Sequence, residues 1–147
     1  MTSKIETRNS KLAEHVHVYA GSVKDFRDLA VWQLGRELRS TIYAISRKFP
    51  AEEKYVLLAQ LRRASISVTA NIAEGFGRFS YRENIQYCRQ ARGSAYELRD
   101  HLTTALDAGY IAKEEWTEID TLAQRVTQVL NGYIRATQKR QSSADIH

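Results

Sequence analysis

Apolar residues recur along the chain at alternating steps of three and four, a spacing that places them on one face of an α-helix. The first run starts near Asp25 or Asp28, either of which can cap a helix N-terminus, and extends to Phe49. Pro50 follows, and the residue before a proline disfavours helical backbone angles. We therefore predict that this helix ends at Phe49. Its expected buried face is Val31, Gly35, Leu38, Ile42, Ile45 and Phe49.

A second helix is predicted over residues 51–75. It begins with Ala51, Glu52 and Glu53, which places two acids against the positive end of the helix dipole. It stops at Gly75, a residue type suited to a left-handed C-cap. Its expected apolar face is Leu57, Leu58, Leu61, Ala64, Val68 and Ile72.

The third helix opens with the pattern of a capping box, since Ser80 can serve as the N-cap and Glu83 stands three residues later. Gly109 closes this helix. Its inward residues are small in the first half, so a neighbouring helix can approach closely there. They are Cys88, Ala91, Ala95, Leu98, Leu102 and Ala105.

A fourth helix starts near Lys113 and carries its own apolar seam. We predict an all-α fold, an antiparallel up-down-up-down four-helix bundle, because four amphipathic helices are joined by short connections. The bundle is expected over residues 25–138, between flexible tails at residues 1–24 and 139–147. The seam of the fourth helix is Trp116, Ile119, Leu122, Val126, Val129, Tyr133 and Ile134.

Length, composition and charge limit the classes of protein to which the chain can belong. A length of 147 residues fits one domain with one hydrophobic core. No run approaches the ~20 apolar residues of a membrane span, the N-terminus has no apolar signal region, and Cys88 has no cysteine partner. These features favour a cytoplasmic location. The formal charge of +5 has the sign expected for a partner that is a nucleic acid or another acidic molecule.

Three sequence segments resemble one known family. The segments are DLAVWQ at residues 28–33, QLRRASISVTANIAEG at residues 60–75 and ARGS at residues 91–94. Their order and spacing are similar to those of the bacterial four-helix-bundle family encoded in intervening sequences of 23S ribosomal RNA genes. The resemblance covers about residues 25–135. It implies a ring-like homopentamer with a basic surface.

The chain is also similar, more distantly, to the accessory proteins of diversity-generating retroelements. These are pentamers that bind nucleic acid and a reverse transcriptase. This resemblance therefore implies two kinds of partner, a nucleic acid (RNA or DNA) and a protein such as a reverse transcriptase.

Positive charge is segregated on the third helix. Residues 62–99 hold seven arginines, no lysine and three acids, which is net +4 of the total of +5. At 100° per residue, five of these arginines and a tyrosine lie within an arc of about 100°. Arginine can bind a phosphate group through two parallel hydrogen bonds, and a tyrosine can stack on an unpaired base. This arginine stripe consists of Arg78, Arg82, Arg89, Arg92, Arg99 and Tyr96.

Two hypotheses for function follow. In the first, the arginine stripe makes the protein a homo-oligomeric, non-enzymatic RNA- or DNA-binding accessory protein. In the second, the protein is an interaction scaffold for a reverse transcriptase or a ribosome-associated protein, and the stripe is a subunit interface or a solvated face. A structural polar motif is expected beside the stripe. In it Asn71 caps or bridges helices, and Glu74 pairs with a cation from Arg62, Arg63, Arg78 or Arg92.

Catalytic chemistry is not predicted. Di-metal bundles use Glu-x-x-His on two helices, and the only match, Glu14 with His17, lies in the N-terminal tail. His101 follows Glu97 at i+4 but has no second histidine in the bundle, and Cys88 has no histidine at motif spacing. We therefore predict neither a metal, nor a cofactor, nor an enzyme activity, and we interpret Cys88 as a small buried residue.

Overall fold

The computed structural model describes residues 23–146, and this part of the chain is all-α, with four long helices and no strand. The predicted N-terminal tail, including Glu14 and His17, lies almost wholly outside the described residues. Three short 3-10 turns accompany the helices. In chain order the elements are η1 (Phe26–Asp28), α2 (Ala30–Ile45), η2 (Ser46–Lys48), η3 (Ala51–Glu53), α3 (Leu57–Gly77), α4 (Tyr81–Asp107) and α5 (Lys113–Asp145).

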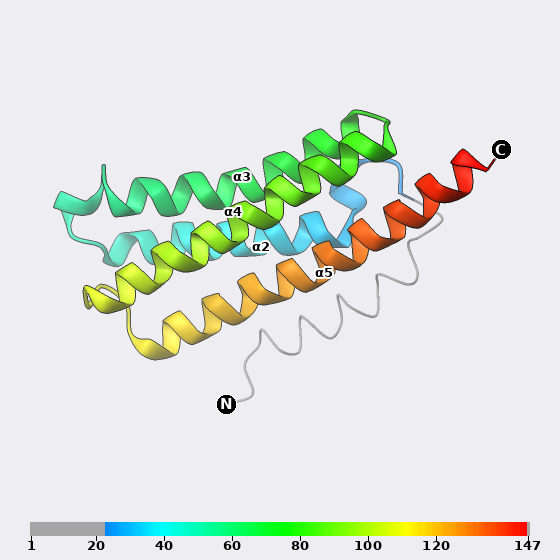
Figure 1. Ribbon diagram of the computed structural model, residues 1–147. Helices are drawn as coiled ribbons and strands as arrows, with labels where there is room; N and C mark the ends of the chain where they lie inside the picture. The colour runs from blue at the N-terminus through cyan, green and yellow to red at the C-terminus, as the bar shows by residue number, and fades with distance from the viewer. Residues whose placement is uncertain (1–22, 147) are drawn as a thin grey trace.

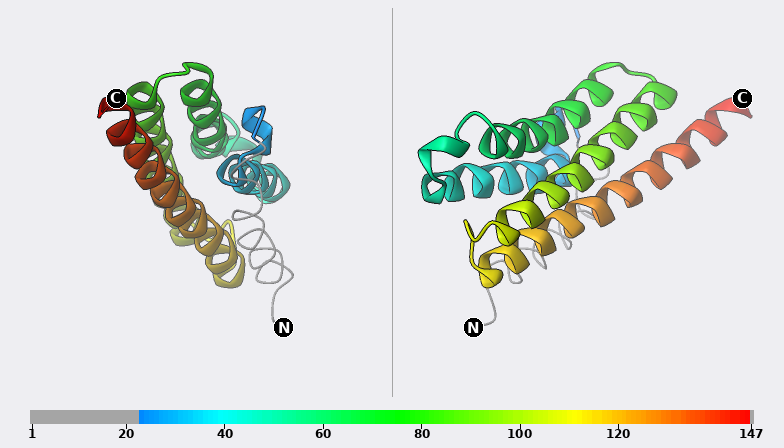
Figure 2. Two further views of the ribbon diagram at one scale, coloured as in Figure 1. Left: turned by 90° about the vertical axis from the view of Figure 1, so that its right-hand side faces the viewer. Right: turned by 60° about the vertical axis from the view of Figure 1, so that its left-hand side comes forward.

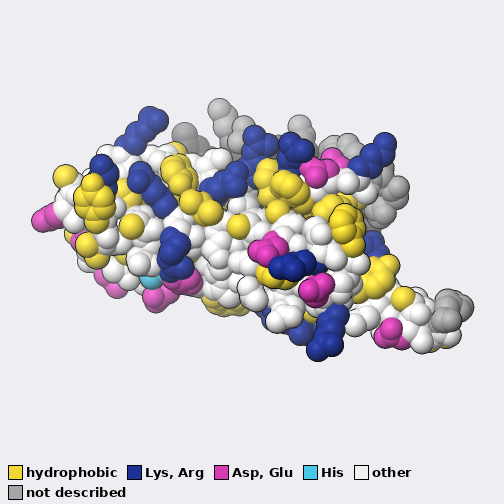
Figure 3. Space-filling view, turned by 90° about the horizontal axis from the view of Figure 1, so that it is seen from above, with side chains coloured by type: hydrophobic (Ala, Val, Ile, Leu, Met, Phe, Trp, Pro, Cys, Tyr) yellow, Lys and Arg dark blue, Asp and Glu magenta, His cyan; other side chains and the backbone are white. Residues whose placement is uncertain are grey.

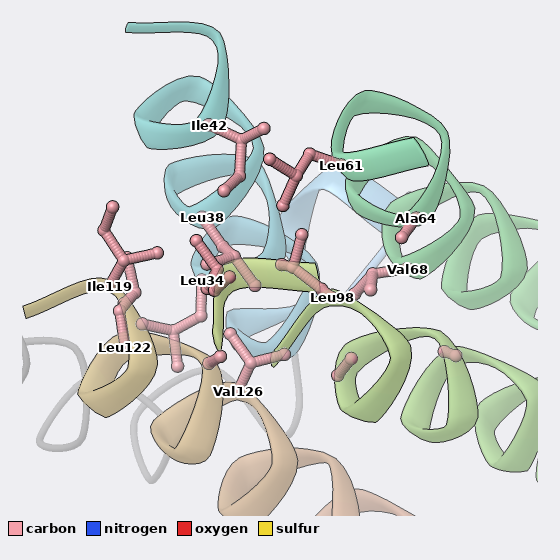
Figure 4. Packing of buried hydrophobic residues seen from close by; sticks show 14 of the residues in the cluster. Leu34, Leu38, Ile42, Leu61, Ala64, Val68, Leu98, Ile119, Leu122 and Val126 are labelled. Atoms are coloured by element: carbon pink, nitrogen blue, oxygen red, sulfur yellow. The ribbon is translucent and has the colours of Figure 1, made fainter. Parts of the chain in front are cut away.

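The four helices enclose one hydrophobic core (Figures 1 and 2). Helix α3 packs along α4, α4 packs along α5, and α2 contacts both α3 and α5. Side chains from all four helices meet in the centre, where Leu38 of α2, Leu61 of α3, Leu98 of α4 and Val126 of α5 are fully buried (Figure 4). No helix in the described part of the chain has the length and apolar character needed to cross a membrane.

The predicted helix faces are those that the core buries. All six residues predicted for the first helix are buried, and so are all six small or apolar residues predicted for α4. Trp32 and Leu34 are buried as well, outside the predicted seam, because α2 packs against two neighbours and so buries a wider face. In α5, Trp116, Val129 and Tyr133 are only partly buried against the core.

Helix α5 is longer than predicted. It continues to Asp145, so residues 139–145 are helical where the sequence pattern predicted a tail. No proline or glycine interrupts this stretch, and Thr137 is still buried at its start. At 1.5 Å per residue α5 is about 50 Å long and α2 only about 24 Å. The end of α5 therefore extends beyond the other helices (Figure 1 and the right-hand view of Figure 2).

The α3 boundaries also differ from the prediction. Residues 51–53 form a separate 3-10 turn, because Val56, with φ −116° and ψ −98°, leaves the helical region before α3 begins. At the other end the helix passes through Gly75 to Gly77, and the left-handed backbone falls on Phe79 with φ +52°. The predicted cap residues of α4 are correct, since Ser80 Oγ accepts a hydrogen bond from the Glu83 amide at 3.3 Å and Gly109 has φ +77°. Of the two hydrogen bonds of the predicted capping box, only this one is formed.

Gly75 is needed for helix approach rather than for capping. A Cβ atom built at this position would lie 2.8 Å from Tyr87 Cβ and 3.2 Å from the Asn84 carbonyl oxygen, both on α4. Contacts this short do not occur without a shift of one helix. Gly77, two residues later, would place a Cβ atom in open space.

We predict opposite effects for two glycine substitutions in α3. Gly75→Ala should lower the free energy of unfolding by about 1–3 kcal/mol, because α3 and α4 must separate to admit the methyl group. Gly77→Ala should be neutral or stabilising by up to about 1 kcal/mol, because alanine is the better helix former. Urea denaturation followed by circular dichroism measures both. Equal effects at the two positions would show that α3 and α4 do not touch at Gly75.

Candidate nucleic-acid interface

The structure divides the arginine stripe into two kinds of residue. Arg82 and Arg89 are exposed on the outer face of α4, and the side chain of neither makes a hydrogen bond or ion pair with another described residue. Tyr96 lies two turns beyond Arg89 on the same face and is 55% exposed. The other three arginines, Arg78, Arg92 and Arg99, are each bonded to a side chain of the protein.

Arg99 joins α4 to α5. Its Nε donates to Asp120 Oδ1 at 2.8 Å, and one of its terminal nitrogens donates to Asp120 Oδ2 at 3.3 Å. Asp120 is buried, and it also accepts from Gln124 at 2.8 Å. The hydrogen bond from Arg99 to Asp120 raises the pKa of the guanidinium. The guanidinium also lies over the ring of Tyr96, 5.4 Å from its centroid. Arg99 is therefore a structural residue, and its charge is already neutralised.

Arg92 also faces α5. One of its terminal nitrogens donates to Asn131 Oδ1 at 2.9 Å, and the residue is partly buried. Arg92 is therefore not the partner of Glu74. Because Asn131 is neutral, Arg92 keeps its charge, but its position between two helices leaves less of it open to a ligand.

Glu74 pairs with Arg78, one of the four partners considered for it. The guanidinium of Arg78 donates to Glu74 Oε1 at 3.0 Å and to the Tyr87 hydroxyl at 2.9 Å, and it lies over the Tyr87 ring. The hydrogen bond to Glu74 raises the pKa of Arg78. About half of each side chain is exposed, so this ion pair lies at the surface, at the end of α3.

The rest of the structural polar motif lies along α3. Asn71 Nδ2 donates to the carbonyl oxygen and the hydroxyl of Ser67, one turn earlier, at 2.8 and 3.0 Å. Ser67 in turn shares a hydrogen bond of 2.8 Å with Ser94 of α4. Asn71 thus bridges the two helices through Ser67.

Arg63 of this motif forms an ion pair with Glu97 of α4, while Arg62 points toward α2. Burial acts to raise the pKa of Glu97. Hydrogen bonds from His101 and Arg63 outweigh this effect and hold the pKa below its usual value.

The described residues provide neither a reactive thiol nor a metal site at this surface. The thiol of Cys88 is fully buried, donates weakly to Asn84 Oδ1 at 3.5 Å, and has a pKa raised by burial to about 12. A thiol in this state is a poor nucleophile. Within residues 23–146, no three His, Cys, Asp or Glu side chains lie close enough together to hold a metal ion.

A second group of arginines, of which only Arg62 was named from the sequence, as part of the structural polar motif, lies on α2 and its neighbours. We define the α2 arginine face as Arg36 and Arg39 of α2, Arg47 of η2, and Arg62 of α3, which lies across from them. On a helical wheel, Arg36, Arg39, Tyr43 and Arg47 fall within an arc of about 80° at 100° per residue. A wheel of the first helix would therefore have revealed most of this face. In the space-filling view, several Lys and Arg side chains lie along the upper part of the molecule, with hydrophobic side chains between them and acidic side chains among them toward the right (Figure 3).

A match to one family model covers residues 27–132, which is most of the chain. The model describes the 23S rRNA-intervening sequence protein family. The chain belongs to this family. The matched range includes the whole arginine stripe and the whole α2 arginine face.

A solved structure supports the fold of this 23S rRNA-intervening sequence family member. It is the crystal structure of a protein of unknown function from the S23 ribosomal protein family of Bacteroides thetaiotaomicron. The likeness has a TM-score of 0.66 at 24% sequence identity, and it covers 71% of this chain and 97% of the other. At this identity the likeness establishes the fold alone. A search of the curated proteins finds no match. The similarity to retroelement accessory proteins remains a prediction.

We predict that two arginines of this family member's α4 differ sharply in their effect on stability. Arg99→Gln should lower the free energy of unfolding by about 2–3 kcal/mol, because it leaves the buried Asp120 carboxylate without its charged partner. Arg89→Gln removes the same charge from an exposed position and should change stability by no more than about 0.5 kcal/mol. Urea denaturation of the two variants gives the comparison. If neither variant changes the free energy of unfolding, Arg99 does not stabilise the packing of α4 against α5.

Proposed function

We propose that this protein is a non-enzymatic accessory protein of the cytoplasm that binds nucleic acid, RNA or DNA, as a homo-oligomer. The observation that carries the proposal is the outer face of α4, where Arg82 and Arg89 are exposed without a carboxylate partner among the described residues and Tyr96 is exposed beside them. The proposal includes an up-down-up-down order of the helices and assembly of five bundles into a ring.

The chemistry of this face suits a phosphodiester backbone. A guanidinium that no carboxylate neutralises keeps its charge and its N–H donors available for phosphate oxygens. Tyr96 can stack on a base, since aromatic stacking accepts any base. We do not assign Arg78 and Arg99 to phosphate contact, because Glu74 and Asp120 already neutralise their charges. We therefore assign phosphate contact on α4 to Arg82 and Arg89, with Arg92 at the margin.

The family name supports a setting in ribosomal RNA genes, because it refers to intervening sequences of 23S rRNA. RNA that contains or flanks such a sequence is accordingly the first ligand to test. The net charge of the protein also favours RNA as a ligand. With a pI of about 9.4 the protein is positively charged at neutral pH and attracts polyanions.

A second candidate function is a protein interaction scaffold that binds a reverse transcriptase or a ribosome-associated protein. Large apolar side chains support it, since Tyr55, Val56 and Phe79 are 83%, 62% and 91% exposed. Gly93, in the middle of α4, supports it as well. A Cβ atom at this position would meet nothing within 4 Å, so no described part of the chain requires a glycine there. A subunit or partner helix that approaches α4 closely would require one.

We predict that removal of two charges from α4 weakens nucleic-acid binding. In Arg82→Gln/Arg89→Gln, the slope of log affinity against log salt should become smaller by about 0.7–0.9 for each phosphate that the variant no longer binds. The affinity should fall by a similar factor for all sequences, because phosphate contacts carry no base information. Fluorescence anisotropy with a labelled RNA, repeated at several salt concentrations, measures the slope.

Tyr96→Ala serves as a contrasting variant, since it removes stacking without removing charge. It should weaken binding to single strands more than to duplexes. Unchanged binding by the arginine variant would exclude α4 as the nucleic-acid site. Dissociation of the arginine variant into smaller species would place Arg82 and Arg89 in a subunit interface and favour the scaffold function.

We predict that the protein is a pentamer in solution. Light scattering coupled to size exclusion should give a mass of about 85 kDa, five times the 16.9 kDa of one chain. Gly93→Gln should lower this mass if the ring packs on α4, because a long side chain blocks close helix approach. A mass of one chain at micromolar concentration would contradict the proposed assembly.

A further inference from the structure

The α2 arginine face differs from the arginine stripe in how its guanidinium groups are held. Arg36 and Arg39 both lie over the ring of Trp32, with their guanidinium carbons 5.7 and 5.9 Å from the ring centroid. One terminal nitrogen of Arg39 also donates to Thr69 Oγ1 of α3 at 2.9 Å. Both arginines are thus oriented by neutral groups.

Arg62 is held in the same manner. Its guanidinium carbon lies 5.2 Å from the ring centroid of Tyr43, and its Nε donates to Ser46 Oγ at 3.3 Å. Arg47 is exposed, and its side chain makes no hydrogen bond or ion pair with another described residue. Within the described part of the chain, none of the four arginines of this face contacts a carboxylate.

This arrangement orients the guanidinium groups without neutralising their charge. Aromatic rings and hydroxyl groups restrict a guanidinium to a few positions, but they leave its full charge and most of its N–H donors available. Two other arginines that join helices, Arg99 with Asp120 and Arg63 with Glu97, are by contrast neutralised by a carboxylate. Four like charges on one face repel one another in the free protein, and a bound anion would remove that repulsion.

A pocket lies within this face. It has a volume of about 500 Å³ and is lined by Ser40, Tyr43, Ala44, Arg47 and Arg62. Two guanidinium groups and a serine hydroxyl, the donor types that bind phosphate oxygens, therefore border one open recess. Tyr43, at its wall, is 44% exposed and presents an aromatic surface next to the cations.

We propose that the α2 arginine face is a phosphodiester-binding surface, with a backbone phosphate seated in the pocket between Arg47 and Arg62. From Arg47 to Arg36 the face extends for about 16 Å along the helix, which is enough for several successive phosphates. The ligand is a nucleic-acid strand, so this inference rests on the proposed function and names a second surface for it. The strand contacts α2 and α3 independently of Arg82 and Arg89 on α4.

Three double variants, each with two charges removed, test this surface. Arg36→Gln/Arg47→Gln alters the α2 arginine face, and Arg82→Gln/Arg89→Gln alters α4. Arg135→Gln/Arg140→Gln is the matched control, because both residues are exposed on α5 and neither pairs with a described acid. The probe is a 5′-fluorescein oligouridylate of about 20 nucleotides, which has no stable fold, measured by anisotropy from about 50 to 200 mM salt.

We expect the affinity of the α2 variant to fall about ten- to thirtyfold at 0.1 M salt, with a salt slope smaller by about 1.4, or 0.7 for each phosphate of a single strand. The control should retain affinity within about threefold, the effect of a change in net charge alone. Arg36→Lys/Arg47→Lys keeps the charge and should restore the salt slope. Circular dichroism and light scattering establish that each variant keeps the wild-type helix content and mass.

Each other result has a defined meaning. If the wild type binds and the α2 variant matches the control, the inference is wrong while the proposed function stands. If the wild type does not bind the probe or a structured RNA, the proposed function fails and the inference fails with it. If the α2 variant changes the mass of the assembly, the face is an interface between copies of the chain. Binding of the wild type to phosphatidylserine vesicles alone would replace nucleic acid by a membrane surface.

Discussion

The close approach of α3 and α4 is the constraint on which the rest of the structure depends. A glycine on α3 is required at the point where Tyr87 of α4 packs, since a Cβ atom at Gly75 would lie 2.8 Å from Tyr87 Cβ. Farther along, Ser67 and Ser94 meet at 2.8 Å. Small inward residues of α4 make this approach possible, because helices separate by the size of the side chains between them. They are Cys88, Ala91 and Ala95. Helices α2 and α5 then complete the core with larger side chains.

Arginine has two distinct uses around this core. Arg63, Arg78 and Arg99 pair with carboxylates and join or brace helices, so their charge is neutralised within the protein. Other arginines are held by rings, hydroxyl groups or an amide, or by nothing among the described residues, and their charge remains available to a partner. Seven of this second set lie on two surfaces, one on α4 and one across α2 and α3, while others, including Arg135 and Arg140, lie on α5. The seven are Arg36, Arg39, Arg47, Arg62, Arg82, Arg89 and Arg92.

Sequence reasoning succeeded where the signal was local. The inward faces of α2 and α4 follow from residue spacing alone, and the caps at Ser80 and Gly109 follow from residue type at a helix end. It failed at Gly75, which was interpreted as a cap, because its role comes from a residue of another helix. It also ended α5 too early, since polar composition at residues 139–145 does not by itself stop a helix.

The sequence by itself determined the four helices, the residues that face the core and the family, because helical periodicity and short motifs are properties of neighbouring positions. The candidate site could be predicted only in part from the sequence. A wheel of one helix placed Arg82, Arg89, Arg92 and Arg99 together, but the groups that distinguish them lie on α5. Asp120 and Asn131 are remote in sequence, and only the packing of α5 against α4 brings them to the arginines. Tertiary structure therefore decided which arginines retain a free charge.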